Sequence, residues 1–392
     1  MGTDPQKFED RLRSGAARLQ VVEHYAVQAE DNRFFVKTAT HSGLLSGRMV
    51  REVLPKLLPL LDGSRSFEDI AESLSGTIGR ERLSQVLEFL SQKGLVRDVE
   101  EPPANLSACD LQPYESMARY FAQGGSRYAT LSRLKSAHIG IVNSGAAVPA
   151  LLSSLAHFGV SRFSVFGDPE IEALEVQQSR YYQTRDQSRE RISVWRERIP
   201  SLNPQLDIKL VPAGADKTAW KTSNWEEALQ NLSMLIVMLQ GPLLFPDWLG
   251  KLNEAAFALR LPWTSIALLD GESAQLGPTI RPGVTACYKC FETRLKSNLG
   301  WLGRNETLDA YLREAKEHVD FGLLPPVADI AAGFAAIEVV RTLSSDSVAQ
   351  TSGKIMLFNA ADFSTEFHPV LKLPRCTVCS PVRNKPQPRI WS

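Results

Sequence analysis

From residue 113 onward, short apolar runs alternate with longer stretches that carry apolar residues at helical spacing. The apolar runs lie at 138–142, 162–166, 206–211, 234–239, 263–268 and 355–358. Helical spacing is clearest at 147–158, 188–199 and 327–343, between these runs. Strands that alternate with helices imply a mainly parallel sheet covered by helices. We therefore expect an α/β domain with a Rossmann-like sheet over 113–392.

The first hundred residues follow a different pattern, in which strands precede three short helices. Strand-like stretches lie at 21–27, 33–37 and 40–45, and helical stretches at 48–61, after Ser66 and at 80–93. Pro55 and Pro59 predict a kink or an early end of the first helix, and Ser66 with Asp69 predicts a capping box. This order predicts a winged helix-turn-helix over 19–100, with a flexible arm at 1–18 and a linker at 101–112.

Composition and charge exclude several classes of function. The 392 residues include 44 Lys+Arg and 44 Asp+Glu, whereas a binder of nucleic acid or anionic membranes usually has a basic surplus. In the third predicted helix, Arg80, Arg82 and Lys93 are offset by Glu81 and Glu88, so we expect no nucleic-acid binding. A zinc-containing transcription factor stays open as an alternative. The apolar run at 232–239 is far shorter than the roughly 20 residues of a membrane span. No signal core precedes it, so we expect a cytoplasmic protein without membrane contact.

Four of the five cysteines form two C-x-x-C pairs that are separated by 85 residues, Cys287 with Cys290 and Cys376 with Cys379. Five cysteines are too few for a disulfide scaffold in a chain of this length. Two such pairs supply four thiolates for a closed tetrahedral zinc site, which leaves no open coordination position. We therefore expect a structural zinc ion; a redox dithiol and four unrelated buried thiols are the alternatives. Cys109 has no role that we can assign.

The first strand-to-helix turn of the second domain is where a doubly wound fold places a glycine-rich phosphate loop. Such a loop needs several glycines so that backbone N–H groups can reach the phosphates. Here Gly145 is the only glycine, and Ala146 and Val148 stand at neighbouring positions. Asp168 follows the second strand, where it either accepts a hydrogen bond from a ribose hydroxyl or opens a Gly-Asp-Pro turn. The pattern indicates a weak or lost nucleotide site, and no Ser/His/Asp or paired-carboxylate arrangement marks a catalytic residue.

Residues 114–211, which include FSVFGDPEIE and QQSRYYQTRDQSRERISVWRERIPSLNP, resemble the ThiF-type, ubiquitin-activating-enzyme-like adenylation fold. The resemblance implies a vestigial nucleotide site made of Gly145, Asp168, Arg180 and Arg191. It also places Gln240 where active members have a magnesium-binding Asp, and a neutral amide is a poor ligand for a hard cation. No cysteine between Cys109 and Cys287 is available to form a thioester. We therefore expect that ATP does not bind this chain.

Three segments closely resemble one branch of that superfamily: LGPTIRPGVTACYKCFETR, PPVADIAAGFAAIEVVRTL and LPRCTVCS. The branch comprises zinc-bearing, catalytically silent partner proteins of azoline-forming cyclodehydratases. These proteins act in the biosynthesis of ribosomal peptides with thiazole and oxazole rings, including bacteriocins and other antibiotics. The segment LLSGRMVREVLPKLLPLLDGSRSFEDIAESL resembles the winged-helix peptide-recognition element of such pathways.

This resemblance implies that the N-terminal domain binds the leader segment of a precursor peptide by strand addition. The exposed edge would be the strand at 40–45 and the groove wall the third helix. The peptide-binding residues would be His41, Leu44, Leu45, Leu83, Val86 and Leu87. Alternatively, the helix residues face only the core. A YcaO-type cyclodehydratase with its own ATP site would be the partner, and a homodimer is also implied. ATP-dependent adenylation of a peptide carboxylate is the alternative function.

Overall fold

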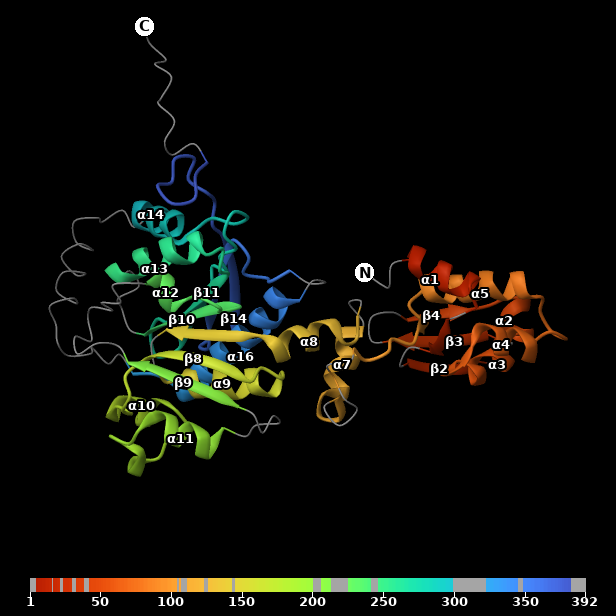
Figure 1. Cartoon of the computed structure of the whole chain (residues 1–392), viewed down its shortest axis with the longest axis horizontal. Helices are drawn as coiled ribbons and strands as arrows, with labels where there is room; N and C mark the ends of the chain where they lie inside the picture. Colours follow the sequence, from red (N-terminus) through yellow and green to blue (C-terminus); the bar gives the residue numbers. More distant parts are fainter. Residues whose placement is uncertain are drawn as a thin grey trace, which may run out of the picture. The chain divides into compact units, whose positions relative to one another are not determined.

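The computed structural model divides into two compact units, Met1–Tyr128 and Ala129–Ser392 (Figure 1). It describes residues 5–15, 17–21, 24–29, 33–38, 42–103, 106, 111–122, 126–142, 145–199, 206–212, 225–240, 246–298, 322–344 and 348–381. The first unit extends beyond the predicted boundary at 113, since helix α7 (Glu115–Ala122) belongs to it. Arg127 forms an ion pair with Glu115, and its backbone N–H donates to the Glu100 carboxylate. These contacts attach α7 to the chain that follows the winged helix.

Helix α1 (Pro5–Arg13) shows that the flexible arm predicted over 1–18 is wrong for residues 5–13. Its Phe8 and Leu12 are buried in the core of the N-terminal unit, together with Leu19 of strand β1 (Arg18–Val21). Arg11 also forms an ion pair with Asp98. Two apolar residues four positions apart lie on one side of a helix, so even this charged segment can bury a narrow stripe.

Two antiparallel sheets and a set of short helices complete the N-terminal unit. The strand orders are β5-β1-β6 and β2-β3-β4. The strands are β2 (His24–Ala29), β3 (Arg33–Thr38), β4 (Ser42–Leu45), β5 (Asp62–Ser66) and β6 (Val96–Asp98). The helices are α2 (Arg48–Glu52), α3 (Leu54–Leu57), η2 (Leu58–Leu60, a 3-10 helix), α4 (Phe67–Ser73) and α5 (Arg80–Gln92). The predicted break near Pro55 and Pro59 and the capping box of Ser66 and Asp69 are both confirmed.

The C-terminal unit is built on an eight-stranded sheet with the order β14-β13-β12-β11-β10-β7-β8-β9. The strands are β7 (His138–Val142), β8 (Arg162–Gly167), β9 (Asp207–Pro212), β10 (Met234–Gln240), β11 (Trp263–Leu268), β12 (Ser273–Leu276), β13 (Lys354–Asn359) and β14 (Ser364–Pro369). The run from β11 to β9 is parallel, which confirms the predicted parallel sheet, and β12, β13 and β14 extend it in antiparallel fashion. β12 has only four residues and β14 is largely polar, so their apolar patterns are too weak to predict strands.

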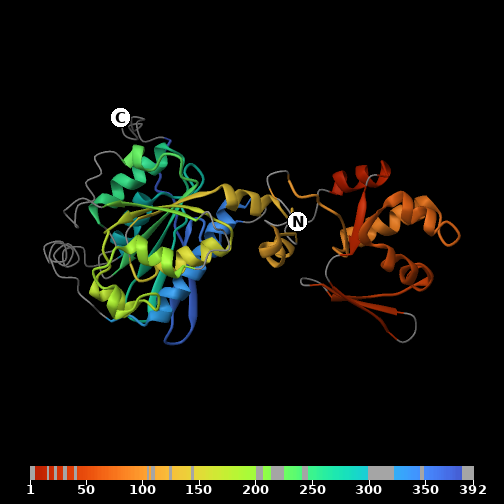
Figure 2. The ribbon, with the colours of Figure 1, turned by 60° about the horizontal axis from the view of Figure 1, so that its bottom comes forward.

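Helices lie on both sides of this sheet (Figure 2). They are α8 (Ala129–Ser136), α9 (Val148–His157), α10 (Ala173–Gln178), α11 (Arg191–Arg198), α12 (Trp225–Ala228), α13 (Asp247–Ala258), α14 (Tyr288–Asn298) and α16 (Pro325–Leu343). Alternate residues of β10, such as Leu235 and Val237, share a core with Leu252 of α13. On the same side, a Cβ atom at Gly140 would lie 2.5 Å from Leu232 Cδ1, so a larger residue at this position of β7 would displace that leucine side chain.

Helix α16 packs against α9 and the sheet, and its buried side is rich in alanine, which permits close approach. The buried Glu338 carboxylate accepts hydrogen bonds from the backbone N–H groups of Gln350 (3.0 Å) and Thr351 (2.8 Å) and from the Thr351 hydroxyl (2.7 Å). It thereby fixes the chain that leads into β13. Among the helices of the described residues, α16 included, none is long and apolar enough to cross a membrane.

Candidate functional site

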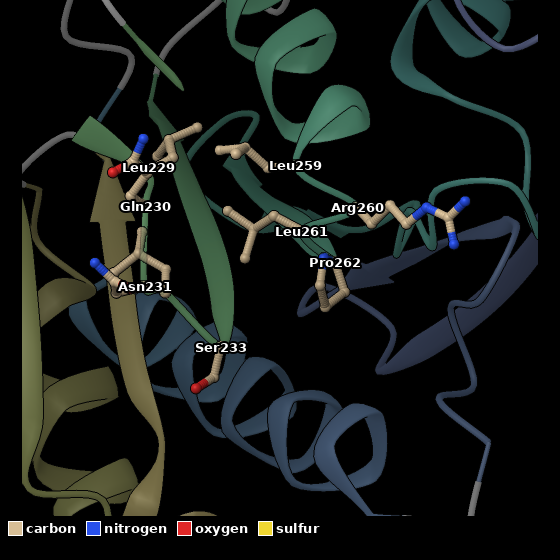
Figure 3. A pocket seen from close by; sticks show the side chains of 9 residues that line it. Leu229, Gln230, Asn231, Ser233, Leu259, Arg260, Leu261 and Pro262 are labelled. Atoms are coloured by element: carbon tan, nitrogen blue, oxygen red, sulfur yellow. The ribbon is translucent and has the colours of Figure 1, made fainter. Parts of the chain in front are cut away.

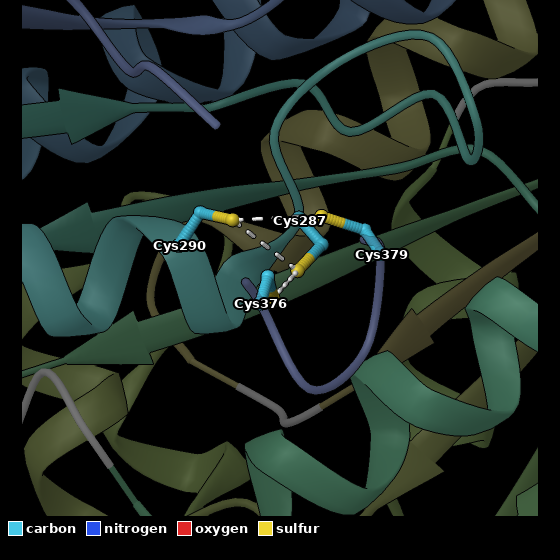
Figure 4. Close-up of side chains that lie close together, drawn as sticks. All are labelled: Cys287, Cys290, Cys376 and Cys379. Atoms are coloured by element: carbon cyan, nitrogen blue, oxygen red, sulfur yellow. Dashed lines mark hydrogen bonds between the residues drawn. The ribbon is translucent and has the colours of Figure 1, made fainter. Parts of the chain in front are cut away.

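The four cysteines of the two C-x-x-C pairs come together in the C-terminal unit (Figure 4). Cys287 and Cys290 lie at the start of α14, and Cys376 and Cys379 lie in the turn that follows β14. All four sulfur atoms are within 4.8 Å of one another, and the Cys287–Cys376 and Cys290–Cys379 Sγ–Sγ distances are both 3.5 Å. These residues therefore form a site that can hold a metal ion.

The two cysteine turns are held in register by polar contacts between α14 and the chain after β14. Arg294 donates from Nε to the Leu371 carbonyl (2.7 Å) and from Nη2 to the Lys372 carbonyl (3.2 Å). Lys372 Nζ donates in turn to the Gly283 carbonyl (3.0 Å). The backbone N–H of Leu373 donates to Cys290 Sγ at 3.3 Å, so the chain after β14 also contacts the first cysteine pair directly.

Burial acts to raise the pKa of three of these thiols. It raises the pKa of Cys287 far above its usual value and the pKa of Cys379 to about 11. Burial also acts to raise the pKa of Cys376, but hydrogen bonds from the backbone N–H groups of Cys379 and Val378 outweigh it and lower the pKa. A cation must therefore displace protons in order to bind, and its affinity falls on acidification.

Gly145 and Asp168 of the predicted nucleotide site lie after two neighbouring parallel strands. Gly145 follows β7 and precedes α9, and Asp168 directly follows β8, which pairs with β7. Gly145 is buried, as are Ala146 and Val148 beside it, and Asp168 is half-buried. Gln240 is the last residue of β10, but its side chain is outside the described residues. The strand ends therefore match a nucleotide-binding fold, and the described residues 145–148 at the start of α9 are buried.

Arg191, the second predicted arginine of this site, is completely buried and bound within the protein. Its Nη1 and Nη2 atoms each lie 2.8 Å from a carboxylate oxygen of Glu175, and its Nε and Nη2 donate to the carbonyls of Asp168 (2.9 Å) and Glu170 (2.6 Å). Burial acts to lower the pKa of Arg191, but the hydrogen bonds and charge of Glu175 outweigh it and raise the pKa. The guanidinium is thus directed into the fold and is not presented to a ligand.

Arg180 differs from Arg191, because it is exposed and pairs with helix α16. Its Nε atom lies 2.8 Å from Asp329 Oδ2, and its guanidinium stacks over the Tyr181 ring at 5.2 Å. Burial raises the pKa of Asp329, although the charge of Arg180 acts in the opposite direction. The structure therefore separates the two predicted arginines into one internal and one surface role.

A pocket of about 400 Å³ lies at the amino ends of β10 and β11 (Figure 3). It is lined by Leu229, Gln230, Asn231, Leu232, Ser233, Leu259, Arg260, Leu261 and Pro262. The turn between β7 and α9, by contrast, follows the carboxyl end of β7. In open α/β sheets, ligands bind at the carboxyl ends of the strands, so this pocket is not the nucleotide site that the sequence predicts.

In the N-terminal unit, β4 is an edge strand, as the sequence predicts, since among the described strands it pairs with β3 alone. Leu44 is 50% exposed and lies opposite Phe35, which is 41% exposed, on the outer side of the sheet. Leu45 points to the other side, where it lines a small apolar cavity with Leu54 and other residues. The rest of the lining is Val21, Val36, Leu58, Leu90, Leu95 and Val96. The edge is therefore apolar on both sides. His41 is outside the described residues.

Of the three predicted peptide-binding residues in the third helix, two lie in the core and one is partly buried beside it. Leu83 and Leu87 are 0% exposed and belong to the core of the unit, so they do not line a surface groove. Val86 is partly buried beside them. Leu90, which the prediction omitted, is the residue of α5 that lines the cavity under β4. Phe35 was also missed, although three consecutive apolar residues in a strand already place one of them on the outer side.

Comparison with known proteins agrees with this architecture. A family model described as the ThiF family matches residues 118–379, and one described as a winged helix-turn-helix domain matches residues 20–98. Because the first match covers well over half of the chain, the protein belongs to the ThiF family. The predicted fold, an N-terminal winged helix followed by a ThiF-type domain, is thereby confirmed. No curated protein sequence matches the chain.

Several solved structures have a similar fold. The heterocyclase TruD superimposes with a TM-score of 0.60 at 18% identity, over 93% of this chain and 43% of TruD. MccB of E. coli, in a structure with succinimide, superimposes with a TM-score of 0.67 at 14% identity, over 92% of this chain and 99% of MccB. PaaA superimposes with a TM-score of 0.65 at 17% identity, over 89% of this chain and 99% of PaaA. At such identities the likeness shows the fold alone. The chain spans less than half the length of TruD and nearly all of MccB and PaaA.

Proposed function

We propose that this protein is a non-catalytic subunit that binds the leader segment of a ribosomal precursor peptide. It would present the peptide to a YcaO-type, ATP-dependent cyclodehydratase that forms thiazoline or oxazoline rings. The observation that carries the proposal is the apolar edge of β4, which pairs with β3 alone among the described strands of a winged helix joined to a ThiF-type domain. The fold likeness to the heterocyclase TruD, over 43% of that chain, supports a role in peptide modification.

Peptide binding at β4 would use the backbone for affinity and alternate side chains for selectivity. An added strand pairs with the open N–H and C=O groups of the edge. Its side chains alternate between the two sides, so one set would lie over Leu44 and Phe35 and the other beside Leu45 and the cavity beneath it. An apolar leader segment with side chains on both sides therefore fits this edge. Delivery to a bound partner raises the effective concentration of the peptide there.

The absence of catalysis in this chain is supported by the nucleotide region. Arg191 binds Glu175 and backbone carbonyls, and Ala146 and Val148 stand in the turn where a phosphate loop needs glycine for close backbone approach. ATP would then bind the partner subunit. We propose the cytoplasm as its location, because sparse cysteines that serve as metal ligands suit a reducing compartment.

We propose zinc as the metal of the cysteine cluster and a structural role for it. A tetrahedral Zn²⁺ with Zn–S bonds of about 2.3 Å places its sulfur ligands about 3.8 Å apart. The Sγ–Sγ distances of 3.5 Å for Cys287–Cys376 and Cys290–Cys379, and of 3.9 Å for Cys287–Cys290, fit this geometry. Four thiolates would close the site and join α14 to the segment after β14.

Fluorescence polarisation with a labelled leader peptide tests the function. We expect saturable binding in the micromolar range or tighter, and Leu44→Asp should weaken it roughly tenfold or more, because it puts a charge on the apolar edge. Phe367→Asp is the matched control, since it changes an exposed apolar residue on a different sheet edge and should leave peptide affinity unchanged. Absence of saturable binding by the cognate leader at micromolar protein would refute the proposal.

An ATP-dependent enzyme that adenylates a peptide carboxylate is the second candidate. The observation that favours it is the fold likeness to MccB in a structure with ATP, with a TM-score of 0.67 over 99% of that chain. This candidate requires that the isolated protein binds a nucleotide and that Asp168→Ala abolishes the binding. Equilibrium titration with a fluorescent ATP analogue decides between the two, because the non-catalytic subunit should show no such signal.

A further inference from the structure

The turn between β13 and β14 presents the most exposed large apolar side chain of the described residues. It comprises residues 360–363, between the paired residues Asn359 and Ser364, and Phe363 at its last position is 80% exposed. The backbone of Phe363 has a φ of 56°, in the left-handed region that favours glycine and asparagine. A bulky aromatic residue is rare in this region, so the turn keeps Phe363 at the expense of backbone strain.

Polar contacts fix this turn at both of its ends. The side chains of Asn359 and Asp362 each accept a hydrogen bond from the backbone N–H two residues later, both at 2.9 Å. The backbone N–H of Ala360 donates to the Glu272 carbonyl (2.8 Å), which joins the turn to the residue before β12. An aromatic side chain that is already held in place loses little conformational entropy on binding. The exposed ring therefore has the features of a preorganised anchor for a binding partner.

The turn lies at the edge of the sheet where the parallel strands have their carboxyl ends. β12 is antiparallel to both β11 and β13, so the carboxyl ends of β11 and β13 lie at one edge. Gly145 and Asp168 follow β7 and β8 at the same edge, since the strands from β11 to β8 are parallel. Leu324, which is 51% exposed, also lies here, because its backbone N–H donates to the Gly271 carbonyl (3.0 Å) in the turn after β11. Ligands of open α/β sheets bind at this edge.

The charge of this surface is negative. Asp270 and Glu272 lie between β11 and β12, Asp362 lies between β13 and β14, and all three are exposed. Neither turn, 269–272 or 360–363, contains Lys or Arg in its sequence. In a chain with equal numbers of acidic and basic residues, the two neighbouring turns are thus locally acidic. Such a surface complements a basic surface and repels a second copy of itself.

We propose that Phe363 inserts into an apolar pocket with a basic rim on the catalytic subunit, the YcaO-type cyclodehydratase, so this inference rests on the proposed function. A ring that protrudes from a turn can be buried only by a concave surface, which a folded protein has and an extended peptide lacks. The leader peptide is therefore a poor occupant. An aromatic anchor buried in a pocket supplies much of the binding energy of an interface. The carboxylates of Asp270, Glu272 and Asp362 would face cations of the rim and favour this orientation.

Biolayer interferometry of the full-length protein with the purified cyclodehydratase subunit of the same pathway tests this inference. We expect Phe363→Gly to raise the dissociation constant roughly tenfold or more, because it removes the anchor. The same change relieves the left-handed strain, so the melting temperature should stay the same or rise. Phe363→Asn, which also suits the left-handed backbone, should have the same effects. A fall in the melting temperature of both variants would instead assign Phe363 a structural role and overturn the proposal.

Two matched controls separate the anchor from general effects of substitution. Arg260→Gly changes an exposed residue with a φ of 53° that precedes β11 at the opposite edge of the sheet, and it should leave the dissociation constant unchanged. Glu272→Lys should raise the dissociation constant about threefold to tenfold at low salt, and less at high salt. Glu254→Lys reverses the charge of an exposed residue of α13 and should have no effect.

The failure of this inference differs from the failure of the proposed function. If the wild type does not bind the cyclodehydratase, the proposed partner is refuted and this inference with it. If the wild type binds and Phe363→Gly binds equally well, only the docking surface is refuted. Fluorescence polarisation should give the same leader affinity for Phe363→Gly and for the wild type, because the leader binds β4 in the other unit.

Discussion

The buried ion pair between Arg191 and Glu175 gives the sharpest test of how the ThiF-type domain is built. Arg191 is 0% exposed, and each of its terminal nitrogens lies 2.8 Å from an oxygen of Glu175. Glu175→Gln retains the shape of the side chain but removes its negative charge. The guanidinium is then left buried without a counter-charge, which two backbone carbonyls only partly offset.

Removing one partner of a buried ion pair costs about 3–5 kcal/mol of unfolding free energy. For a unit of this size, that cost corresponds to a fall of roughly 6–20 °C in the melting temperature. Differential scanning calorimetry of the full-length protein measures the change in the transition of the C-terminal unit. Glu197→Gln is the matched control, because Glu197 forms an exposed ion pair with Arg189 (2.7 Å) in the same segment. An exposed pair contributes only about 0–1 kcal/mol.

Equal, small effects of Glu175→Gln and Glu197→Gln would refute this reasoning, since the buried charge would then not depend on its partner. A double variant adds a second criterion. Replacing both Glu175 and Arg191 with leucine removes both charges together and should destabilise less than Glu175→Gln alone. If Arg191 instead served a nucleotide, Glu175→Gln would release it and raise nucleotide affinity, which we do not expect.

Three further predictions concern the metal, the backbone and the core. Metal analysis should find about one zinc per chain, and Cys290→Ser should lose it together with much of the stability, with affinity falling on acidification as protons compete for the thiolates. A residue other than glycine costs roughly 1–2 kcal/mol of unfolding free energy in the left-handed conformation that Gly277 adopts. Gly277→Ala should cost well over this amount, because the added Cβ would also lie 2.8 Å from the carbonyl oxygen of Lys354. Gly283→Ala is the control, since Gly283 has a similar φ but its added Cβ would meet no atom within 4 Å, so it should cost only the strain of the left-handed backbone. Chemical denaturation measures the unfolding free energy of both variants. Leu87→Ala should cost about 2–5 kcal/mol, whereas Leu44→Ala should leave stability nearly unchanged.

Prediction from sequence succeeded where local pattern is sufficient. The break at Pro55 and Pro59 follows from the missing N–H of proline, and the cap formed by Ser66 and Asp69 follows from residues three positions apart. Prediction from sequence failed where contacts between distant segments decide whether a helix or strand forms. Helix α1 was missed because its short stripe is stabilised by the core beneath it, and β14 because pairing with β13 holds a polar strand in place.

The sequence by itself determined the order of the domains, the parallel sheet and which four cysteines form the metal-binding cluster, because hydrophobic periodicity and motif spacing can be read from neighbouring residues. Only the tertiary structure decided which apolar residues of α5 are core and which border the surface, since periodicity reveals a stripe but not what covers it. It also decided that Arg191 binds Glu175 rather than facing a ligand. The order of the described strands, which depends on contacts between segments far apart in the chain, likewise decided that β4 and β14 lie at the edges of their sheets.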